Sequence, residues 1–282
     1  MAFPSGFDAT DQAVFIPEVW SARINEFFRA NLTAGNFFLD VSGDLSDGGD
    51  KVHIPNLTAI SAAAKTNAVA VSPATNTETG VDLTVNTWYY AAVMIEKKEM
   101  RGMKQSYGMQ ERYAKALAYA CAKQLDSALV ALFSGLDYSV GSSTATLADS
   151  DIRAAIAYLD AADVPDTDRA FFFHPNELWG DLMAIDRYVL LDNGGDGAIR
   201  NGAFAMLYGY PVYKSSNIGV TLGSRCGALA HKEALVWASL YGIQTDTNYI
   251  PEYLATLITS DIVYGVVENR GTAGVCIKSS SV

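Results

Sequence analysis

The sequence has few of the residues on which catalysis and metal binding usually depend. It contains only three histidines and three cysteines in 282 residues. Cys121, Cys226 and Cys276 are far apart and odd in number, and neither a CxxC pair nor the Cys/His spacing of a zinc site is present. We therefore expect reduced thiols in a protein of the cytosol.

Long apolar runs are missing as well. No stretch of about 18 apolar residues is present, so the sequence predicts no membrane-spanning segment. Residues 1–8 lack the basic region followed by an apolar run that marks a signal peptide. Positive charge is scarce, because the formal net charge is −11 and the acidic residues are spread along the chain. Such a surface repels phosphate and argues against a dedicated nucleic-acid-binding protein.

No histidine lies in a catalytic motif. His174 follows a predicted buried strand, where it could act as a general base or a metal ligand. A base needs a nucleophile and an orienting carboxylate, yet the GxSxG, HExxH and nucleophilic-cysteine signatures are absent. We therefore interpret His174 as a turn or capping residue. His231 also follows a predicted strand, and His53 lies in a predicted hairpin.

Two other polar segments do not indicate a catalytic or cofactor-binding site either. Residues 193–197, Asn-Gly-Gly-Asp-Gly, lack the motifs of phosphate loops and the closing Glu of a calcium loop, and we interpret them as a surface loop. Lys97, Lys98, Arg101 and Lys104 form a basic group that either pairs with acidic residues of a neighbouring subunit or is simply solvated. No catalytic, cofactor-binding or metal-binding residue is therefore assigned, and no cofactor is expected.

Hydrophobic residues make up half of the chain, which is enough for one large domain or two modest ones. Residues 1–12 predict an extended arm, and residues 15–20, with Pro17 in the first turn, open a short amphipathic helix that ends before Gly35. The region carries more aromatic surface than it can bury by itself, in Phe27, Phe28, Phe37 and Phe38. We expect these side chains to dock on the body of the protein or on a neighbour.

Strand patterns lie on both sides of a stretch of small residues. Residues 51–54 begin one strand, and residues 58–80 contain almost no large side chain. Residues 81–97 alternate, with one face formed by Leu83, Val85, Tyr89, Ala91, Val93 and Ile95. The cluster Trp88-Tyr89-Tyr90 indicates strand packing rather than a platform for stacked bases. The pattern predicts a long antiparallel hairpin, which is marginal alone in water and therefore indicates a partner surface.

The strongest helix prediction covers residues 105–135. Its apolar face consists of residues spaced by three or four, namely Tyr113, Leu117, Cys121, Leu125, Ala128 and Leu132. Its polar face carries Glu111, Arg112, Lys115, Lys123 and Asp126. Helices and short strands then alternate: helices from Asp149 and Pro175, strands at 169–173, 210–213 and 227–230, one or two helical turns at 231–238, and strands at 255–267 and 274–278.

This order of arm, hairpin, long helix and α/β region resembles the Hong Kong 97-type major capsid proteins of tailed bacteriophages. Residues 15–38 resemble the arm of that family, residues 50–97 its extended loop and residues 105–135 its spine helix. The resemblance continues over nearly the whole chain, in residues 164–173 with Pro175, 208–213, 227–235, 261–265 and 275–278. It implies an α+β fold with an N-terminal arm, an extended β-hairpin loop, a long spine helix, a peripheral-domain sheet and an α/β axial domain.

The resemblance also implies boundaries for these parts. We expect an N-terminal arm with a short helix in residues 1–44, the extended loop in 45–100, the spine helix and first part of the peripheral domain in 101–148, the axial domain in 149–250, and the closing strands of the peripheral domain in 251–282.

The function implied by the resemblance is self-assembly into an icosahedral head shell around packaged double-stranded DNA, without enzymatic activity. The expected partners are further copies of the chain in pentamers and hexamers, with DNA enclosed but not bound sequence-specifically, and no membrane. Because the chain begins at the arm, a scaffold is expected to be a separate protein, and portal and decoration proteins can join. We expect assembly in the host cytoplasm and a final place in the virion.

Some relatives crosslink a lysine to an asparagine, and Lys65 lies in the predicted extended loop without an identifiable partner. Two alternatives stay open. One is a bacterial protein compartment of the same fold that encloses cargo enzymes. The other is an α/β hydrolase-like or ligand-binding protein that uses His174 and the loop at residues 192–197.

Overall fold

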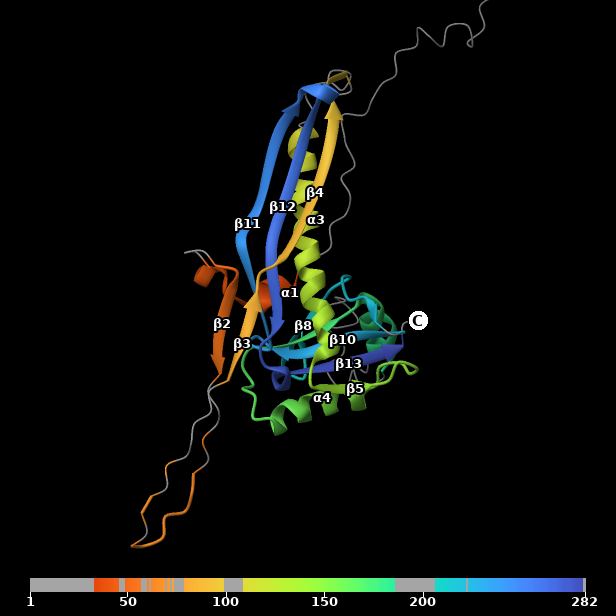
Figure 1. Cartoon of the computed structure of the whole chain (residues 1–282). Coiled ribbons are helices and arrows are strands. Elements are labelled where there is room, and N and C mark those ends of the chain that lie inside the picture. The colour runs from red at the N-terminus through yellow and green to blue at the C-terminus, as the bar shows by residue number, and fades with distance from the viewer. Residues whose placement is uncertain are drawn as a thin grey trace, which may run out of the picture.

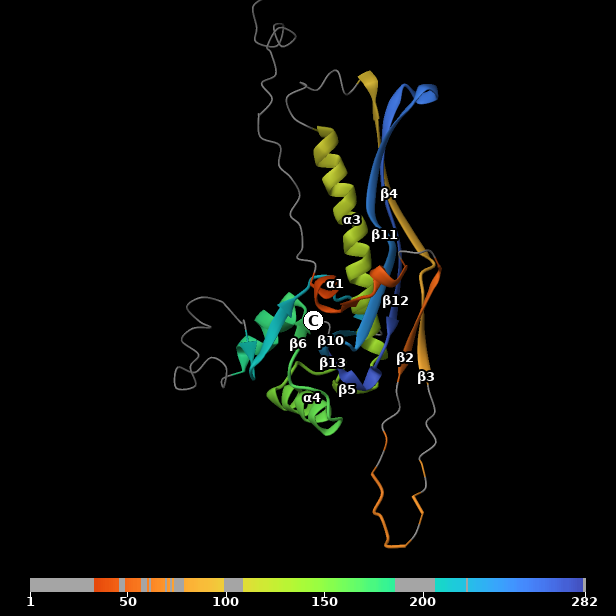
Figure 2. The ribbon, with the colours of Figure 1, turned by 90° about the vertical axis from the view of Figure 1, so that its left-hand side faces the viewer.

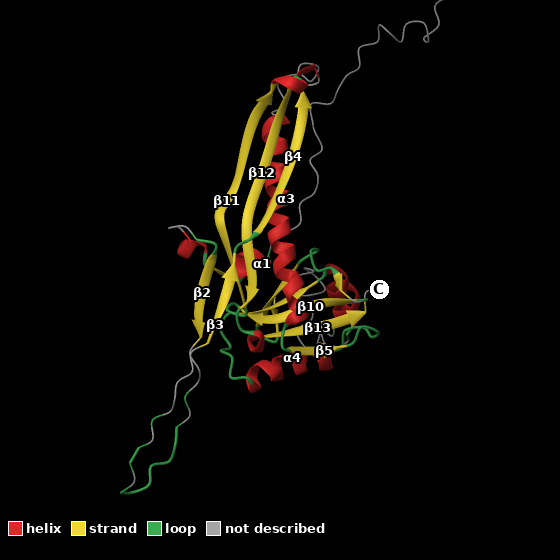
Figure 3. Cartoon of the chain, viewed as in Figure 1, coloured by secondary structure: helices red, strands yellow, loops and turns green. Residues whose placement is uncertain are grey.

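Two sheets of different shape organise the chain, whose computed structural model describes residues 33–45, 49–56, 60, 62–68, 70–71, 73, 79–98, 109–185, 206–221 and 223–280. In Figures 1 and 3 a sheet of long strands rises, together with one long helix, from a body built on the second sheet. The loop between β2 (Lys51–Asn56) and β3 (Thr79–Thr84) extends in the opposite direction. The residues that open the predicted N-terminal helix (15–20), the loop at 192–197, Arg101 and Lys104 lie outside the described residues.

The long sheet has the strand order β1-β11-β12-β4. Its strands are β1 (Leu39–Asp40), β11 (Leu235–Ile250), β12 (Ala255–Glu268) and β4 (Thr87–Glu96). β11 and β12 form a hairpin closed by the 3-10 turn η7 (Pro251–Tyr253), after which Leu254 adopts the left-handed conformation with φ 48°. β4 runs antiparallel to β12 from Glu96 opposite Ala255 to Thr87 opposite Tyr264.

The predicted spine helix is confirmed as α3 (Met109–Ala131), which continues as the 3-10 turn η3 (Leu132–Gly135). The helix lies along one face of the long sheet (Figure 2). Leu117, Cys121 and Leu125 are buried there against Ile258 and Ile262 of β12. By length and composition alone, the segment from residue 111 to 135 is apolar enough to cross a membrane. Here its apolar face instead packs on the sheet.

The second sheet has seven strands in the order β5-β13-β10-β6-β8-β7, with β9 paired to β10. The strands are β5 (Tyr138–Gly141), β6 (Arg169–Phe173), β7 (Met206–Leu207), β8 (Tyr210–Lys214), β9 (Val220–Thr221), β10 (Ser224–His231) and β13 (Gly274–Ser280), and the 3-10 turns η1 (Ser42–Leu45) and η8 (Gly271–Ala273) lie in connecting segments. Strand β6 is buried throughout, as predicted for residues 169–173.

Both faces of the seven-stranded sheet are covered. Phe171 and Phe173 pack with α4 (Asp149–Ala161), the π-helical turn η4 (Glu177–Asp181) and the 3-10 turn η5 (Leu182–Ala184). Phe172, from the same strand, faces the other way and packs with Phe38 and Phe133, close to the end of α3. The alternation of a single strand therefore joins two hydrophobic cores.

The predicted hairpin over residues 51–97 is wrong in its second half. β2 pairs with β3, but the chain then leaves this ribbon and β4 joins β12 instead. The predicted face is confirmed, because Ala91, Val93 and Ile95 pack toward α3. On the long sheet, α3 covers the apolar face of β4 and removes more of its surface from water than a two-stranded ribbon could. This explains why β4 pairs with β12 instead of continuing the ribbon of β2 and β3.

The helical turns predicted at residues 231–238 are also wrong. His231 to Ala234 form a tight turn, in which the Ala234 N–H donates to the His231 carbonyl at 3.0 Å. β11 then begins, and Leu235 and Val236 are fully buried. Pairing with the later strand β12 decides the conformation here, so a local pattern was a poor guide.

Sheet pairing does not follow the order of the expected domains. β11 ends at the expected boundary between residues 149–250 and 251–282, yet it pairs with β12 beyond that boundary. β13, from the last segment, pairs with β10 in the seven-stranded sheet. The expected limits of the peripheral and axial domains therefore stay predictions.

A buried carboxylate joins the short helix α1 (Ala34–Phe37) to α3. Asp126 is 1% exposed, and its Oδ1 accepts the backbone N–H groups of Ala34 at 2.8 Å and Gly35 at 3.2 Å. Its Oδ2 accepts the Nδ2 of Asn217 at 2.6 Å. The assignment of Asp126 to the polar face of the helix is therefore wrong. Three hydrogen bonds to the charged group compensate for its burial.

Replacing this carboxylate should destabilise the subunit. Asp126→Ala leaves two N–H groups and one amide unpaired, so we expect the free energy of unfolding to fall by about 2–4 kcal/mol in urea denaturation. Asp126→Asn retains one acceptor and should cost less. Asp246→Ala, at an exposed position of β11, is the control and should change stability by less than about 0.5 kcal/mol. Equal effects of Asp126→Ala and the control would contradict the anchoring role.

Candidate assembly interface

The face of the long sheet opposite α3 carries large side chains that no described element covers. Trp88 is 70% exposed, Tyr90 77% and Met94 48%, and all three lie on β4 at the positions between those that pack toward α3. In Figure 2 the helix lies on one side of β4, β11 and β12 only. Exposed aromatic and apolar surface of this kind marks an interaction site. We call this surface, with Tyr241 and Asp261, the outer sheet face.

Asp261 of β12 orders the aromatic rings of the outer sheet face. The Nε1–H of Trp88 donates to its Oδ2 at 3.0 Å, and the hydroxyl of Tyr241 donates to the same oxygen at 2.6 Å. This hydrogen bond to the carboxylate raises the pKa of Tyr241, because it stabilises the protonated phenol. Rings from β4 and β11 are thus fixed on both sides of β12, and side chains already held in place lose less entropy when a partner binds.

Two projections from the body also carry exposed apolar side chains. Tyr253 and Leu254 lie at the far end of the β11–β12 hairpin, and both are more than half exposed. Ile60 and Val71 lie in the extended loop and are exposed as well. Exposed apolar groups on projections are available to another molecule, so both projections indicate contacts between subunits.

Of the predicted basic group, only Lys97 and Lys98 are described. The backbone N–H of Lys97 donates to the carbonyl of Leu254 at 2.9 Å, and its ammonium group lies 5.8 Å from the ring centre of Tyr249. Lys97 therefore helps to close the end of the long sheet within its own subunit. Lys98 is exposed, and its pairing with a neighbour stays a prediction.

The three histidines lie in separate places. The Nδ1 of His174 accepts the backbone N–H of Asn176 at 3.1 Å, which confirms its interpretation as a turn residue, and the Nδ1 of His231 accepts the N–H of Glu233 at 3.2 Å in the same way. Burial lowers the pKa of His174, which favours the neutral acceptor. His53 lies on β2 beside Asp82 of β3, with Nδ1 and Oδ1 2.5 Å apart.

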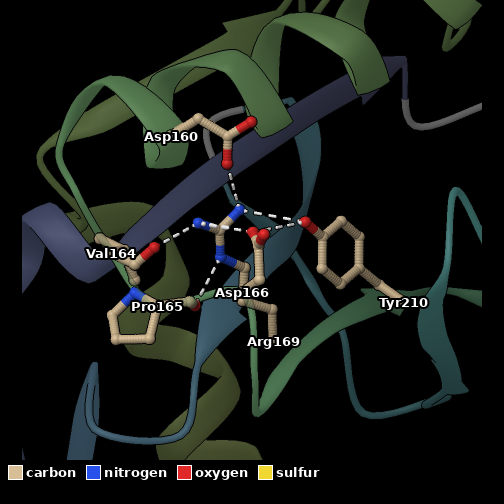
Figure 4. A network of polar contacts seen from close by, with 6 residues as sticks. All are labelled: Asp160, Val164, Pro165, Asp166, Arg169 and Tyr210. Carbon is tan, nitrogen blue, oxygen red and sulfur yellow. Dashed lines mark hydrogen bonds and ion pairs between the residues drawn. The ribbon is translucent and has the colours of Figure 1, made fainter.

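Arg169 is the most deeply buried cation of the described residues, and Figure 4 shows that its guanidinium group is fully engaged. The group donates to the carbonyl of Pro165 at 2.9 Å, to Asp160 at 2.6 Å, to the hydroxyl of Tyr210 at 3.2 Å and to the carbonyl of Val164, and it forms an ion pair with Asp166 at 3.2 Å. The Tyr210 hydroxyl donates in turn to Asp166 at 3.0 Å. Arg169 therefore fixes the loop before β6 and is not available to a phosphate or a substrate.

The described part of the chain contains no group of three or more His, Cys, Asp or Glu side chains that could hold a metal ion. The carboxylate of Glu177 accepts the backbone N–H of His174 at 2.9 Å and not a ring proton, and the ring contact of His174 among the described residues is with the backbone N–H of Asn176. What the structure does assemble is an ordered aromatic surface, and such a surface supports binding rather than catalysis.

Sequence reasoning found part of this surface. Trp88 and Tyr90 are on the face opposite Ala91, Val93 and Ile95, as predicted, and the packing expected in this cluster is confirmed for Tyr89, whose ring stacks on Tyr264 with centroids 6.0 Å apart. Asp261 and Tyr241 were missed. A signal was present, because Asp261 is the only charged residue between positions 255 and 267.

The chain is similar to known phage capsid proteins. The sequence model of a family described as phage capsid protein matches residues 103–275. None of the proteins with curated functional descriptions matches the chain.

Solved structures give the same result for the fold. A structure from Mycobacterium phage Che8 has a TM-score of 0.80 and 22% identity, and the match covers 93% of this chain and 97% of that one. The capsid structure of the Cyanophage P-SCSP1u has a TM-score of 0.77 at 13% identity, with 95% and 94% covered. The mature capsid of bacteriophage PhiM1 has a TM-score of 0.75 at 14% identity, with 94% and 92% covered.

The role of Asp261 can be tested on the isolated subunit. Asp261→Ala removes the acceptor for Trp88, so we expect hydrogen exchange of the Trp88 indole N–H to become several times faster, measured by NMR and assigned with Trp88→Phe. The global stability should change by less than about 1 kcal/mol, because the bond is exposed to water. Asp261→Asn retains an acceptor and should preserve part of the protection. An unchanged exchange rate in Asp261→Ala would show that the carboxylate does not hold the ring.

Proposed function

The chain belongs to the phage capsid protein family, and we propose that its copies join as pentamers and hexamers into an icosahedral shell, with the outer sheet face as a contact surface. It is a major capsid protein that forms the shell of a phage head, and its place in the virion is the capsid. Its role there is structural. The compartment and hydrolase alternatives have no comparable support.

The observation that carries the proposed contact is the exposure of Trp88 and Tyr90 on an ordered strand. Large aromatic side chains are enriched in protein interfaces and often dominate their binding energy. Trp88 is held by Asp261 at 3.0 Å, so it is exposed but not free to fold back onto its own subunit. A neighbouring subunit that covers this face would remove the apolar surface from water without a rearrangement of the sheet.

The two projections would supply the complementary contacts. The extended loop carries Ile60 and Val71, and between Val52 and Asn76 its only formally charged side chain is Lys65. An almost uncharged segment can lie on an apolar face with little desolvation cost. Tyr253 and Leu254, at the end of the long hairpin, would meet other subunits. Each contact can be weak, because a subunit in a closed shell makes many contacts at once.

The net negative charge is consistent with a shell that encloses DNA without binding it. A formal net charge of −11 gives little attraction to phosphate, so packaged DNA would be held by the closed volume rather than by binding. We further propose assembly in the host cytoplasm. A separate scaffolding protein, a portal and decoration proteins are the expected additional partners.

If the outer sheet face is a contact between subunits, the loss of Trp88 should impair assembly without unfolding the subunit. Trp88→Ala removes the largest exposed ring of the outer sheet face, so we expect the yield of closed shells from purified full-length protein to fall at least about tenfold, measured by electron microscopy and light scattering. The fold of the subunit should be unchanged by circular dichroism, because the side chain is mostly outside the core. Trp88→Phe keeps an aromatic ring and should assemble better than Trp88→Ala.

Trp179→Ala is the matched control, since Trp179 is also exposed but lies on η4 in the body. We expect it to assemble at close to the normal yield. The proposed contact is wrong if Trp88→Ala assembles as well as the unmodified protein. A subunit that forms no oligomer under any assembly condition, with or without other virion components, would contradict the proposed route through capsomers.

A further inference from the structure

Two thiols meet on one face of the seven-stranded sheet. Cys226 of β10 lies opposite Lys278, and Cys276 of β13 lies opposite Ala228, so the two cysteines are diagonal neighbours. Their side chains lie on the same face of the sheet, and both cysteines are buried and free. The third cysteine, Cys121, is elsewhere, buried under the long sheet.

A cavity of about 160 Å³ lies against Cys226. Its wall contains small or polar side chains from the end of α3, from η3 and from the segment before β9: Ser127, Ala131, Ser134, Asn217 and Gly219. Ala131, Ser134 and Gly219 are exposed, so the cavity reaches the surface of the subunit. The Oδ1 of Asn217 is buried and has no hydrogen-bond partner among the described residues.

We propose that Cys226 is a site of covalent modification, at which its thiol exchanges with small disulfides, and that Cys276 is the positioning residue that prepares it. The thiolate of Cys226 attacks one sulfur of the disulfide, and a new S–S bond to Cys226 forms as the original S–S bond breaks. The other half leaves as a thiolate and takes up a proton from water. The disulfide is the only oxidant required. The proposal does not depend on the contact proposed for assembly.

The surroundings of Cys226 favour its thiolate. The S–H of Cys276 donates to it and lowers the pKa of Cys226, and the hydroxyl of Ser224 and the charge of Lys278 act in the same direction. Burial and the carboxylate of Glu177 oppose this effect. Since the thiolate is the nucleophile, Cys226 should react at a lower pH than an ordinary buried cysteine.

Cys121 provides the contrast within the same chain. It is 2% exposed, and its S–H donates to the carbonyl of Ser260 at 3.4 Å. Burial raises the pKa of Cys121, so little thiolate is present at neutral pH.

The geometry favours a lasting adduct over a disulfide between the two cysteines. Diagonal neighbours on antiparallel strands have Cα atoms about 7–8 Å apart. A disulfide requires about 4.4–6.8 Å, so closing one here would shift a strand at the centre of the sheet. A group added to Cys226 can instead enter the cavity, where the unpaired oxygen of Asn217 can accept a hydrogen bond. Asn217 also binds Asp126, so the adduct lies next to the contacts that fix α1.

The probe is bis(2-hydroxyethyl) disulfide, which transfers a small group with one hydroxyl donor. Purified, unassembled full-length protein is treated at pH 7.5, and intact mass and peptide mapping follow each cysteine. We expect one adduct, on Cys226, forming at least about tenfold faster than any adduct on Cys121. Because mapping is done on the unmodified sequence, the result does not depend on whether a variant folds.

Variants then test the role of Cys276. Cys276→Ala removes the S–H donor, so the rate at Cys226 should fall severalfold and the midpoint of its pH–rate profile should move to higher pH. Cys276→Ser restores a donor and should return the profile toward its original position, which a merely structural role would not require. Cys121→Ser should leave the rate at Cys226 unchanged.

Three results would overturn the proposal. The first is equal reactivity of Cys226 and Cys121. The second is an adduct that forms only in urea, which would mean that the cavity gives no access. The third is the loss of two hydrogens with Cys226 joined to Cys276, which would make the pair a disulfide switch instead of a modification site.

Discussion

One helix can cover only one face of a sheet, and this constraint shapes the elongated half of the molecule. α3 buries Ile258 and Ile262 of β12 together with the apolar positions of β4. The β2–β3 ribbon covers the other face of these strands only near the body, around Val236, Ala238 and Val267, and Trp88 and Tyr90 of β4 stay exposed on that face. A soluble enzyme would place polar residues there. A subunit of a shell has neighbours, and its second face can be completed by one of them.

The body supplies the rigidity that such contacts need. Strand β6 joins the two cores of the seven-stranded sheet, with Phe172 packed near the end of α3 on one face and Phe171 and Phe173 on the other, and Asp126 fixes α1 where the chain enters the body. Arg169 holds the loop before β6 through hydrogen bonds from all three guanidinium nitrogens. These residues are engaged in contacts within their own subunit. They hold the projections at fixed positions, and closed shells require subunits that meet their neighbours at repeatable angles.

The sequence predicted the buried faces of strands and helices, which local periodicity determines. It missed the strand partners, which depend on segments far apart in the chain. The alternation along β4 and the spacing along α3 gave the right buried faces. The partner of β4 could not be predicted, because β12 lies far along the chain and no local signal links them. The start of β11, at residues 235–238, was predicted as part of a helical turn for the same reason. Asp126 was placed in solvent because its position on the helix reveals nothing of the Ala34 and Asn217 groups that satisfy it.

The central claim is that the outer sheet face is completed by a second subunit, and the structure of the assembled shell tests it most directly. A cryo-electron microscopy reconstruction of particles formed by the full-length protein should show Trp88, Tyr90 and Met94 covered by a neighbouring chain, with the Trp88 indole still bonded to Asp261. A shell in which this face remains open to solvent in every subunit would contradict the account, however well the fold itself agreed.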